Sequence, residues 1–286
     1  MRWSAGDRGN IEDMRGRSGG GGGMIPLGIG GVIIVALLSM FTGVNFFDVL
    51  GGGSSSTPNS SAVGTSGKVT TSPGEEKMVD MVDAVARDAQ ETWSEKLGSR
   101  YQPTKVVLFR DSIQSACGYA GAATGPFYCP GDHKVYLDLG FFDELSRRFG
   151  APGDFAQAYV LAHEIGHHVQ YLTGTEAQMR QMQRSNPGSA NALSVRLELQ
   201  ADCYAGVWGH DASRAGRFAA GGVELDPGDL DEAMRAAAAI GDDRMQKLGT
   251  GRVMPERFTH GSSEQRVSWF KRGFDSGDPQ ACNTFQ

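Results

Sequence analysis

The chain has 286 residues and a formal net charge of −6, with 40% hydrophobic and 21% charged residues. This length accommodates one or two domains with a sizeable core. The acidic balance argues against nucleic acid as a partner. Many of the 41 glycines lie near the N-terminus, so their number reflects linkers more than the core.

The N-terminal part of the chain predicts a membrane anchor. Residues 1–23 are polar and rich in arginine, whereas residues 24–44 are apolar and uncharged. A helix of that length extends about 31 Å, enough to span a bilayer core. No Lys or Arg follows until Lys68, so the positive-inside rule leaves residues 1–23 in the cytoplasm and the bulk of the chain outside. A cleaved signal peptide is the alternative, but no Ala-x-Ala site follows closely.

Residues 45–72 are the predicted linker between this anchor and the folded domain. From Gly51 onward they are rich in Gly, Ser and Thr, the composition of a flexible tether. The domain is expected to comprise residues 73–286. Its first helix is indicated by Ser72 as N-cap, followed by proline at the first helical position.

Two strands and a short helix are expected next. Residues 105–109 are predicted to form a buried strand, and residues 134–139 show the alternation of a strand. A Gly-rich loop, residues 117–131, separates them. A short helix is expected over residues 142–149.

A His-Glu-x-x-His motif follows. His163 and His167 are four residues apart, so in a helix both imidazoles lie on one face, one turn apart. Two neutral imidazoles placed in this way can bind one Zn²⁺. Glu164 is rotated about 100° around the helix axis and can reach a water on the metal without binding the metal itself. The pattern is typical of a zinc hydrolase in which the glutamate takes a proton from water.

Helix boundaries surround the motif. Asp154 is a suitable N-cap, and Gln157 three residues later completes a capping-box pattern. Good helix formers follow, and Gly174 suits the position just beyond the helix end. A chance match to the motif is the alternative, so the hypothesis depends on a second signal downstream.

That second signal is a pair of carboxylates. Catalytic zinc needs a third protein ligand and an open position. Gln170 and Thr173 stand where a metzincin has Gly and His, which excludes that class. A helix predicted over residues 189–209 carries Glu198 and Asp202 on one face, among apolar neighbours where unpaired carboxylates would be costly. We expect Glu198 to bind the metal. We expect Asp202 to accept a hydrogen bond from the ring nitrogen of a liganding histidine that does not bind the metal. The alternative is that both carboxylates simply lie on a solvated helix face.

Together, residues 163–168 and 198–203 resemble the gluzincin pattern, and more specifically the bacterial family of membrane-anchored neutral zinc metallopeptidases. The resemblance implies a zincin-like α+β fold: a mainly helical domain with a small sheet, preceded by one N-terminal transmembrane helix. In zincins the strand before the metal helix often lies at the cleft edge, where a peptide can add as an extra strand, which this sequence allows for residues 134–139. The resemblance covers most of the chain apart from the linker and includes residues 1–3, 125–130, 135–139 and 282–285.

The chain has four cysteines, an even number that suggests two disulfides in an exported domain. Three pairings are possible. We prefer Cys117–Cys129, which closes the Gly-rich loop, and Cys203–Cys282, which ties the C-terminus to the helix of Glu198. A cysteine zinc site lacks a Cys-x-x-Cys pair, and reduced buried thiols are the other alternative.

Three further helices are expected. Residues 176–184 are predicted to form a polar surface helix, and residues 230–246 an Ala-rich helix. Ser262 and Gln265 indicate the start of a final helix.

A peptidase also needs a hydrogen-bond donor for the oxyanion of the tetrahedral intermediate. Candidates are His260, Tyr204 and Tyr171. His260 is preferred because it lies in a loop just before a helix, a frequent place for catalytic side chains. A loop or capping histidine is the alternative.

The combined hypothesis is a zinc-dependent peptidase anchored on the outer side of the cytoplasmic membrane. His163, His167 and Glu198 hold Zn²⁺, Glu164 is the general base, and the substrate is a peptide or protein. One alternative is a non-catalytic, zinc-stabilised module that binds envelope partners, which would have no use for Glu164. The other is a zinc amidase acting on cell-wall peptides, which differs only in substrate.

Overall fold

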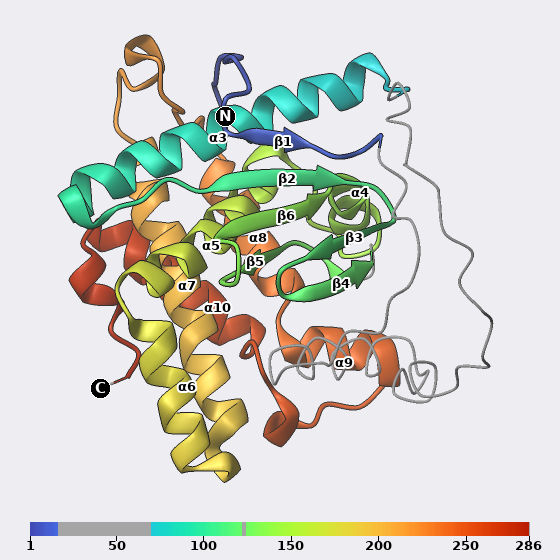
Figure 1. Ribbon diagram of the computed structural model, residues 1–286, viewed down its shortest axis with the longest axis vertical. Helices are drawn as coiled ribbons and strands as arrows, with labels where there is room; N and C mark the ends of the chain where they lie inside the picture. Colours follow the sequence, from blue (N-terminus) through green and yellow to red (C-terminus); the bar gives the residue numbers. More distant parts are fainter. Residues whose placement is uncertain (17–69, 122–123, 286) are drawn as a thin grey trace, which may run out of the picture.

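The computed structural model describes residues 1–16, 70–121 and 124–285 (Figure 1). This part of the chain is mostly helical, with one four-stranded and one two-stranded sheet. Figure 1 shows α3 running beside β1 along one edge of the molecule. The helices are α3 (Pro73–Leu97), α4 (Gly140–Arg147), α5 (Asp154–Leu172), α6 (Thr175–Ser185), α7 (Ala190–Ala212), α8 (Asp229–Ala239), α9 (Asp242–Thr250) and α10 (Ser263–Ser276).

Helix α5 lies at the centre of the helical packing. It contacts α3, α7 and α8, and α7 in turn packs along α10. One hydrophobic cluster joins these helices to the inner side chains of the sheet, and Trp93, Tyr159 and Trp208 are among its fully buried members. The segment that carries the His-Glu-x-x-His motif is therefore held on several sides by core packing.

The four-stranded sheet has the order β1-β2-β6-β5. Strands β1 (Ile11–Asp13), β2 (Lys105–Phe109) and β6 (Lys134–Asp138) are parallel, and β5 (Phe127–Cys129) is antiparallel to β6. Because β6 has a neighbour on each side, residues 134–139 cannot offer an edge to a peptide. The edge strands of this sheet are β1 and β5, and β5 is the one next to β6. The Gly-rich loop also contains β4 (Gly118–Gly121), which forms a hairpin with β3 (Ser112–Ser115).

Two helix starts are confirmed at atomic detail. Ser72 accepts a hydrogen bond from the N–H of Glu75 at 3.1 Å, and proline follows as the first residue of α3. At the start of α10, Ser262 and Gln265 form a reciprocal capping box. These side chains satisfy backbone N–H groups that have no partner within the helix.

The predicted helix over residues 230–246 is interrupted. Helix α8 ends at Ala239, and α9 begins at Asp242. Gly241 between them is extended, and a Cβ added there would lie 2.6 Å from the Cα of Ser263. The start of α10 therefore approaches the backbone at Gly241, a tertiary contact that an Ala-rich local pattern does not reveal.

Glycines allow α5, α7 and α10 to approach closely. A Cβ added to Gly166 on α5 would lie 3.1 Å from the carbonyl oxygen of Ala201 on α7. A Cβ on Gly273 of α10 would overlap the carbonyl oxygen of Cys203. These contacts bring side chains of α7 and α10 to the motif face of α5.

Both preferred disulfides are present. Cys117–Cys129 links the β3–β4 hairpin to β5, and Cys203–Cys282 links α7 to the 3₁₀ helix at Pro279–Cys282.

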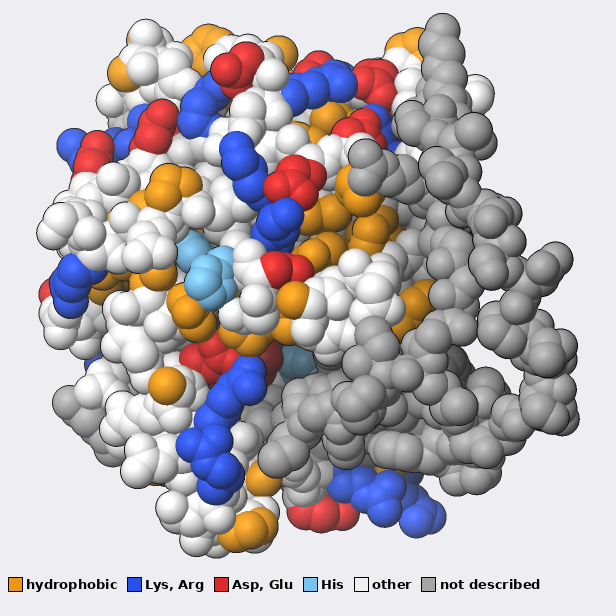
Figure 2. Space-filling view, in the orientation of Figure 1, with side chains coloured by type: hydrophobic (Ala, Val, Ile, Leu, Met, Phe, Trp, Pro, Cys, Tyr) orange, Lys and Arg blue, Asp and Glu red, His pale blue; other side chains and the backbone are white. Residues whose placement is uncertain are grey.

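The N-terminal residues belong to the folded body. Strand β1 pairs with β2, and Arg15 forms ion pairs with Glu75 and Glu76 on α3. Figure 2 shows basic and acidic side chains interleaved along the edge where α3 lies. Asp154 is not the N-cap of α5; that position is Gly153, and the Asp154 carboxylate lies 3.3 Å from the ammonium group of Met1.

This arrangement corrects the predicted fold class and localisation. Strand β1 lies in the same sheet as the domain, so residues 1–16 cannot lie in the cytoplasm with the domain on the opposite side of a membrane, as the prediction for residues 1–23 required. The predicted anchor, residues 24–44, and nearly all of the linker, residues 45–72, lie outside the described residues. Among the helices that are described, none combines the length and the apolar character needed to cross a membrane. The α+β expectation is replaced by a mostly helical fold with two small sheets, of which the larger is mainly parallel.

Candidate metal centre

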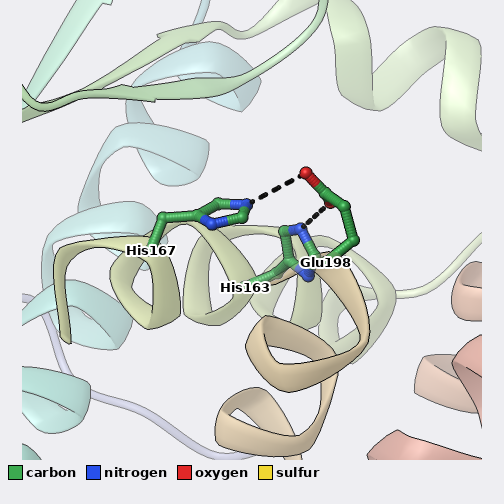
Figure 3. A group of neighbouring side chains, drawn as sticks. All are labelled: His163, His167 and Glu198. Atoms are coloured by element: carbon green, nitrogen blue, oxygen red, sulfur yellow. Dashed lines mark hydrogen bonds and ion pairs between the residues drawn. The ribbon is translucent and has the colours of Figure 1, made fainter. Parts of the chain in front are cut away.

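Three side chains from two helices converge at one point (Figure 3). His163 and His167 project from successive turns of α5, and Glu198 reaches them from α7. The Nε2 atom of His163 lies 3.1 Å from Oε2 of Glu198, and Nε2 of His167 lies 3.6 Å from Oε1. One ligand atom from each residue lies within 4.8 Å of the others. The sequence spacing thus brings both imidazoles and the distant carboxylate together.

The centre is partly open to solvent. The side chains of His167 and Glu198 keep 16% and 18% of their surface exposed, whereas His163 keeps 8%. A small molecule can therefore approach the point where the three residues meet.

His163 is oriented from behind by a buried ionic network. Its Nδ1 atom lies 2.8 Å from Oδ1 of Asp202, and Arg266 on α10 donates two hydrogen bonds of 2.9 Å to the same carboxylate. The hydroxyl of Tyr159 also donates to Asp202. A carboxylate that accepts from Nδ1 leaves Nε2 free to face Glu198, which is the orientation a metal ligand requires.

His167 is oriented by a neutral group. Its Nδ1 atom lies 2.8 Å from Oε1 of Gln170, which is fully buried. Both histidines therefore present Nε2 to Glu198, but only His163 has a charged hydrogen-bond partner at Nδ1.

The charges around the centre favour a cation. Burial, the largest effect, lowers the pKa of His163, yet Asp202 and Glu198 raise it to about 10. Burial also opposes ionisation of Glu198, but the nearby His260 and His167 hold its pKa well below the usual range. The site thus keeps an ionised carboxylate and concentrates positive charge on its imidazoles. Two imidazoles and a carboxylate are a donor set that fits Zn²⁺, which would replace that positive charge.

Glu164 lies beside the first imidazole in sequence and is 8% exposed. No described residue forms a hydrogen bond or ion pair with its carboxylate. Its charge contributes to the raised pKa of His167, so it lies near the centre. A buried carboxylate without a protein partner is available to bind water or a substrate group.

His260 lies in the loop before α10 and close enough to lower the pKa of Glu198. Its Nδ1 lies 3.3 Å from Oδ1 of Asp242, whose other oxygen accepts hydrogen bonds from the backbone N–H groups of Thr259, His260 and Gly261. Asp242 therefore fixes both the loop and the ring, and Nε2 of His260 has no described partner.

The rings of the two tyrosine candidates pack on other aromatic side chains. Tyr204 packs edge-to-face on Trp93, and Tyr171 packs at a tilt against His133. His168, next to His167, is buried and bridges to the hydroxyl of Tyr128 on β5 at 3.0 Å, so its role is to attach that strand to α5.

Sequence reasoning missed Tyr159, Gln170, Arg266 and Asp242. A signal existed for Arg266: it lies four residues before Phe270, on the apolar stripe of the final helix, where an arginine requires a buried partner. Nothing local distinguished Asp242 from the other acidic residues at helix starts.

Comparison with known proteins agrees with this chemistry. The model of a family described as "Putative neutral zinc metallopeptidase" matches residues 1–285. The uncharacterized protein YpfJ of Escherichia coli (strain K12) is 46% identical over 297 residues, covering 100% of this chain and 99% of that protein. The uncharacterized protein Rv2575 of Mycobacterium tuberculosis (strain ATCC 25618 / H37Rv) is 44% identical over 208 residues, covering 71% of this chain and 69% of that protein. No solved structure matches the chain.

Proposed function

The chain belongs to this family of zinc metallopeptidases, and from that premise we propose that it hydrolyses peptide bonds with Zn²⁺ held by His163, His167 and Glu198. The observation that carries the proposal is the convergence of these three side chains. The carboxylate of Glu164, whose charge acts on His167, forms no hydrogen bond or ion pair with a described residue. A metal that only stabilised the fold would have no use for that carboxylate.

The proposed chemistry divides between the metal and the protein. When bound, Zn²⁺ lowers the pKa of water and polarises a carbonyl oxygen. Glu164 takes the proton of the attacking water and passes it to the leaving amine. His260 donates a hydrogen bond from Nε2 to the developing oxyanion, with its ring oriented by Asp242.

We further propose that an extended peptide substrate binds at the edge of the sheet beside this centre. Among the described strands, β5 pairs only with β6, so its other edge has no strand partner. Tyr128 ties β5 to His168, which is adjacent to one of the proposed ligands. In our proposal the substrate backbone pairs with β5 and its scissile bond lies over the metal centre.

The test is a Glu164→Gln variant of the full-length chain. We expect bound zinc, measured by elemental analysis, to remain, and cleavage of a quenched peptide library to fall by at least about 100-fold, the range for loss of a general base. Glu144→Gln, an exposed glutamate on α4, is the matched control and should cleave like wild type.

Three outcomes would change the proposal. A Glu164→Gln variant as active as wild type would remove the assigned base. A wild-type protein that binds zinc but cleaves neither proteins nor cell-wall peptides would be a binding module. Cleavage restricted to cell-wall peptides would make it an amidase.

A further inference from the structure

A chain of side-chain amides runs from the metal centre to the C-terminal end of the protein. His167 Nδ1 lies 2.8 Å from Oε1 of Gln170, and Nε2 of Gln170 lies 3.0 Å from Oε1 of Gln200. Nε2 of Gln200 then lies 3.0 Å from the carbonyl oxygen of Cys282. The two glutamines are 0% and 6% exposed, so water does not substitute freely for these hydrogen bonds.

We call the chain of hydrogen bonds from His167 through Gln170 and Gln200 to Cys282 the relay. The carbonyl of Cys282 determines which group donates and which accepts in each of its hydrogen bonds. A backbone carbonyl can only accept, so Gln200 must direct its NH₂ group toward Cys282 and its oxygen toward Gln170. Gln170 must then present its NH₂ group to that oxygen. The same NH₂ group donates to the carbonyl of Leu197 at 2.7 Å, which fixes its orientation a second time.

These directions determine which nitrogen of the His167 imidazole carries hydrogen. With its NH₂ group committed, Gln170 presents only an oxygen to His167, so Nδ1 of the ring must carry hydrogen. The lone pair of the neutral ring then lies on Nε2, the atom that faces Glu198 at 3.6 Å. The opposite tautomer would place the lone pair of Nδ1 against the amide oxygen of Gln170, and neither atom would then have a hydrogen bond at this contact.

We infer that Gln170 and Gln200 are positioning residues that hold His167 in the tautomer able to bind a metal through Nε2. The inference rests on the proposed zinc centre. It gives the Cys203–Cys282 disulfide a second role, because that bond fixes the carbonyl at which the relay ends. The two histidines are thus oriented by different means: His163 by an ionised carboxylate, and His167 by neutral amides.

The first test measures zinc affinity of the full-length protein by competition with a chromophoric chelator. Gln170→Leu should bind zinc about 10–100-fold more weakly, the usual effect of removing a group that orients a metal ligand. Gln200→Leu should weaken binding less, because Leu197 still orients Gln170. Gln157→Leu is the matched control: this half-buried glutamine lies on the same helix and forms no hydrogen bond with a described residue. Unchanged affinity in Gln170→Leu would overturn the inference.

The second test reads the tautomer directly and does not depend on a variant that folds. Nitrogen-15 chemical shifts of labelled histidine in the zinc-free wild-type protein, at alkaline pH where the rings are neutral, should show His167 protonated on Nδ1. Protonation on Nε2 would refute the relay. Because this measurement needs neither zinc nor turnover, its result is separate from that of the Glu164→Gln experiment: an inactive or metal-free protein would refute the proposed function without changing the assigned tautomer.

Discussion

The carboxylate of Asp202 joins His163 to Arg266 inside the protein. Asp202 is 0% exposed, and the Arg266 side chain 3% exposed, so the ion pair is isolated from solvent. The network connects α5, α7 and α10 at the point where the proposed metal ligand projects. It is therefore both a structural element and the support of His163.

Removing one partner of this pair should destabilise the fold. Arg266→Leu would leave Asp202 buried without its main counter-charge, a change that typically costs about 3–5 kcal/mol. Urea unfolding in the presence of a chelator measures this without a contribution from metal. Lys271→Leu, on the same helix in an exposed pair with Asp275, is the control and should change stability by at most about 1 kcal/mol. An Arg266→Leu protein as stable as the control would contradict the prediction.

The pair of His260 and Asp242 should act on catalysis rather than on metal binding. His260→Leu should lower kcat by about 100–1,000-fold with zinc content unchanged, as expected for loss of an oxyanion donor. Asp242→Asn should lower kcat as well, because the charge that orients the ring is lost.

Steady-state kinetics of the double variant then tests whether the two residues act as a unit. We expect the double variant to be no slower than His260→Leu alone. Additive losses would show that Asp242 acts on turnover by another route, most simply through the loop whose backbone it holds.

Local signals in the sequence predicted those elements that depend on neighbouring residues. The spacing of His163 and His167, the serine caps of α3 and α10, and the alternation at residues 134–139 all act within one segment, and each predicted element is present. The position of Glu198 also followed from helical spacing, once a third ligand was required.

Contacts between segments that are distant in the sequence could not be predicted from such local patterns. Asp202 and Arg266 are 64 residues apart, and β1 is a three-residue strand whose pairing with β2 leaves no pattern in a polar N-terminus. The break at Gly241 has the same origin, because its cause is the backbone of α10. The predicted membrane topology failed for this reason: charge counting treated the N-terminal segment as separate from the domain, whereas residues 1–16 are part of it.

The close contact at Gly273 should make this position intolerant of any side chain. A Cβ there would overlap the carbonyl oxygen of Cys203, so Gly273→Ala should destabilise the protein by about 1–3 kcal/mol or more through overpacking. Gly249→Ala on α9, where nothing lies within 4 Å, should instead be neutral or stabilising by about 0.5–1 kcal/mol. Thermal unfolding of the two variants separates the close helix contact from general helix propensity; similar melting temperatures would count against the contact.

Attachment of the N-terminal segment should weaken in acid. Hydrogen bonds from Arg15 lower the pKa of Asp13, and those from Arg8 lower the pKa of Glu76. A carboxylate whose pKa is lower in the folded state stabilises that state above its unfolded pKa, roughly 4, and loses this contribution as pH falls through the folded pKa.

Hydrogen exchange of the β1 amides, corrected for intrinsic exchange rates, should therefore show protection that falls below about pH 4 while the amides of α5 stay protected. In Arg15→Gln the protection of β1 should already be low at neutral pH and should depend less on pH, because the charge that depresses the carboxyl pKa is absent. Equal protection of β1 in wild type and variant at every pH would show that strand pairing alone, rather than the arginine–carboxylate cluster, attaches residues 1–16 to the domain.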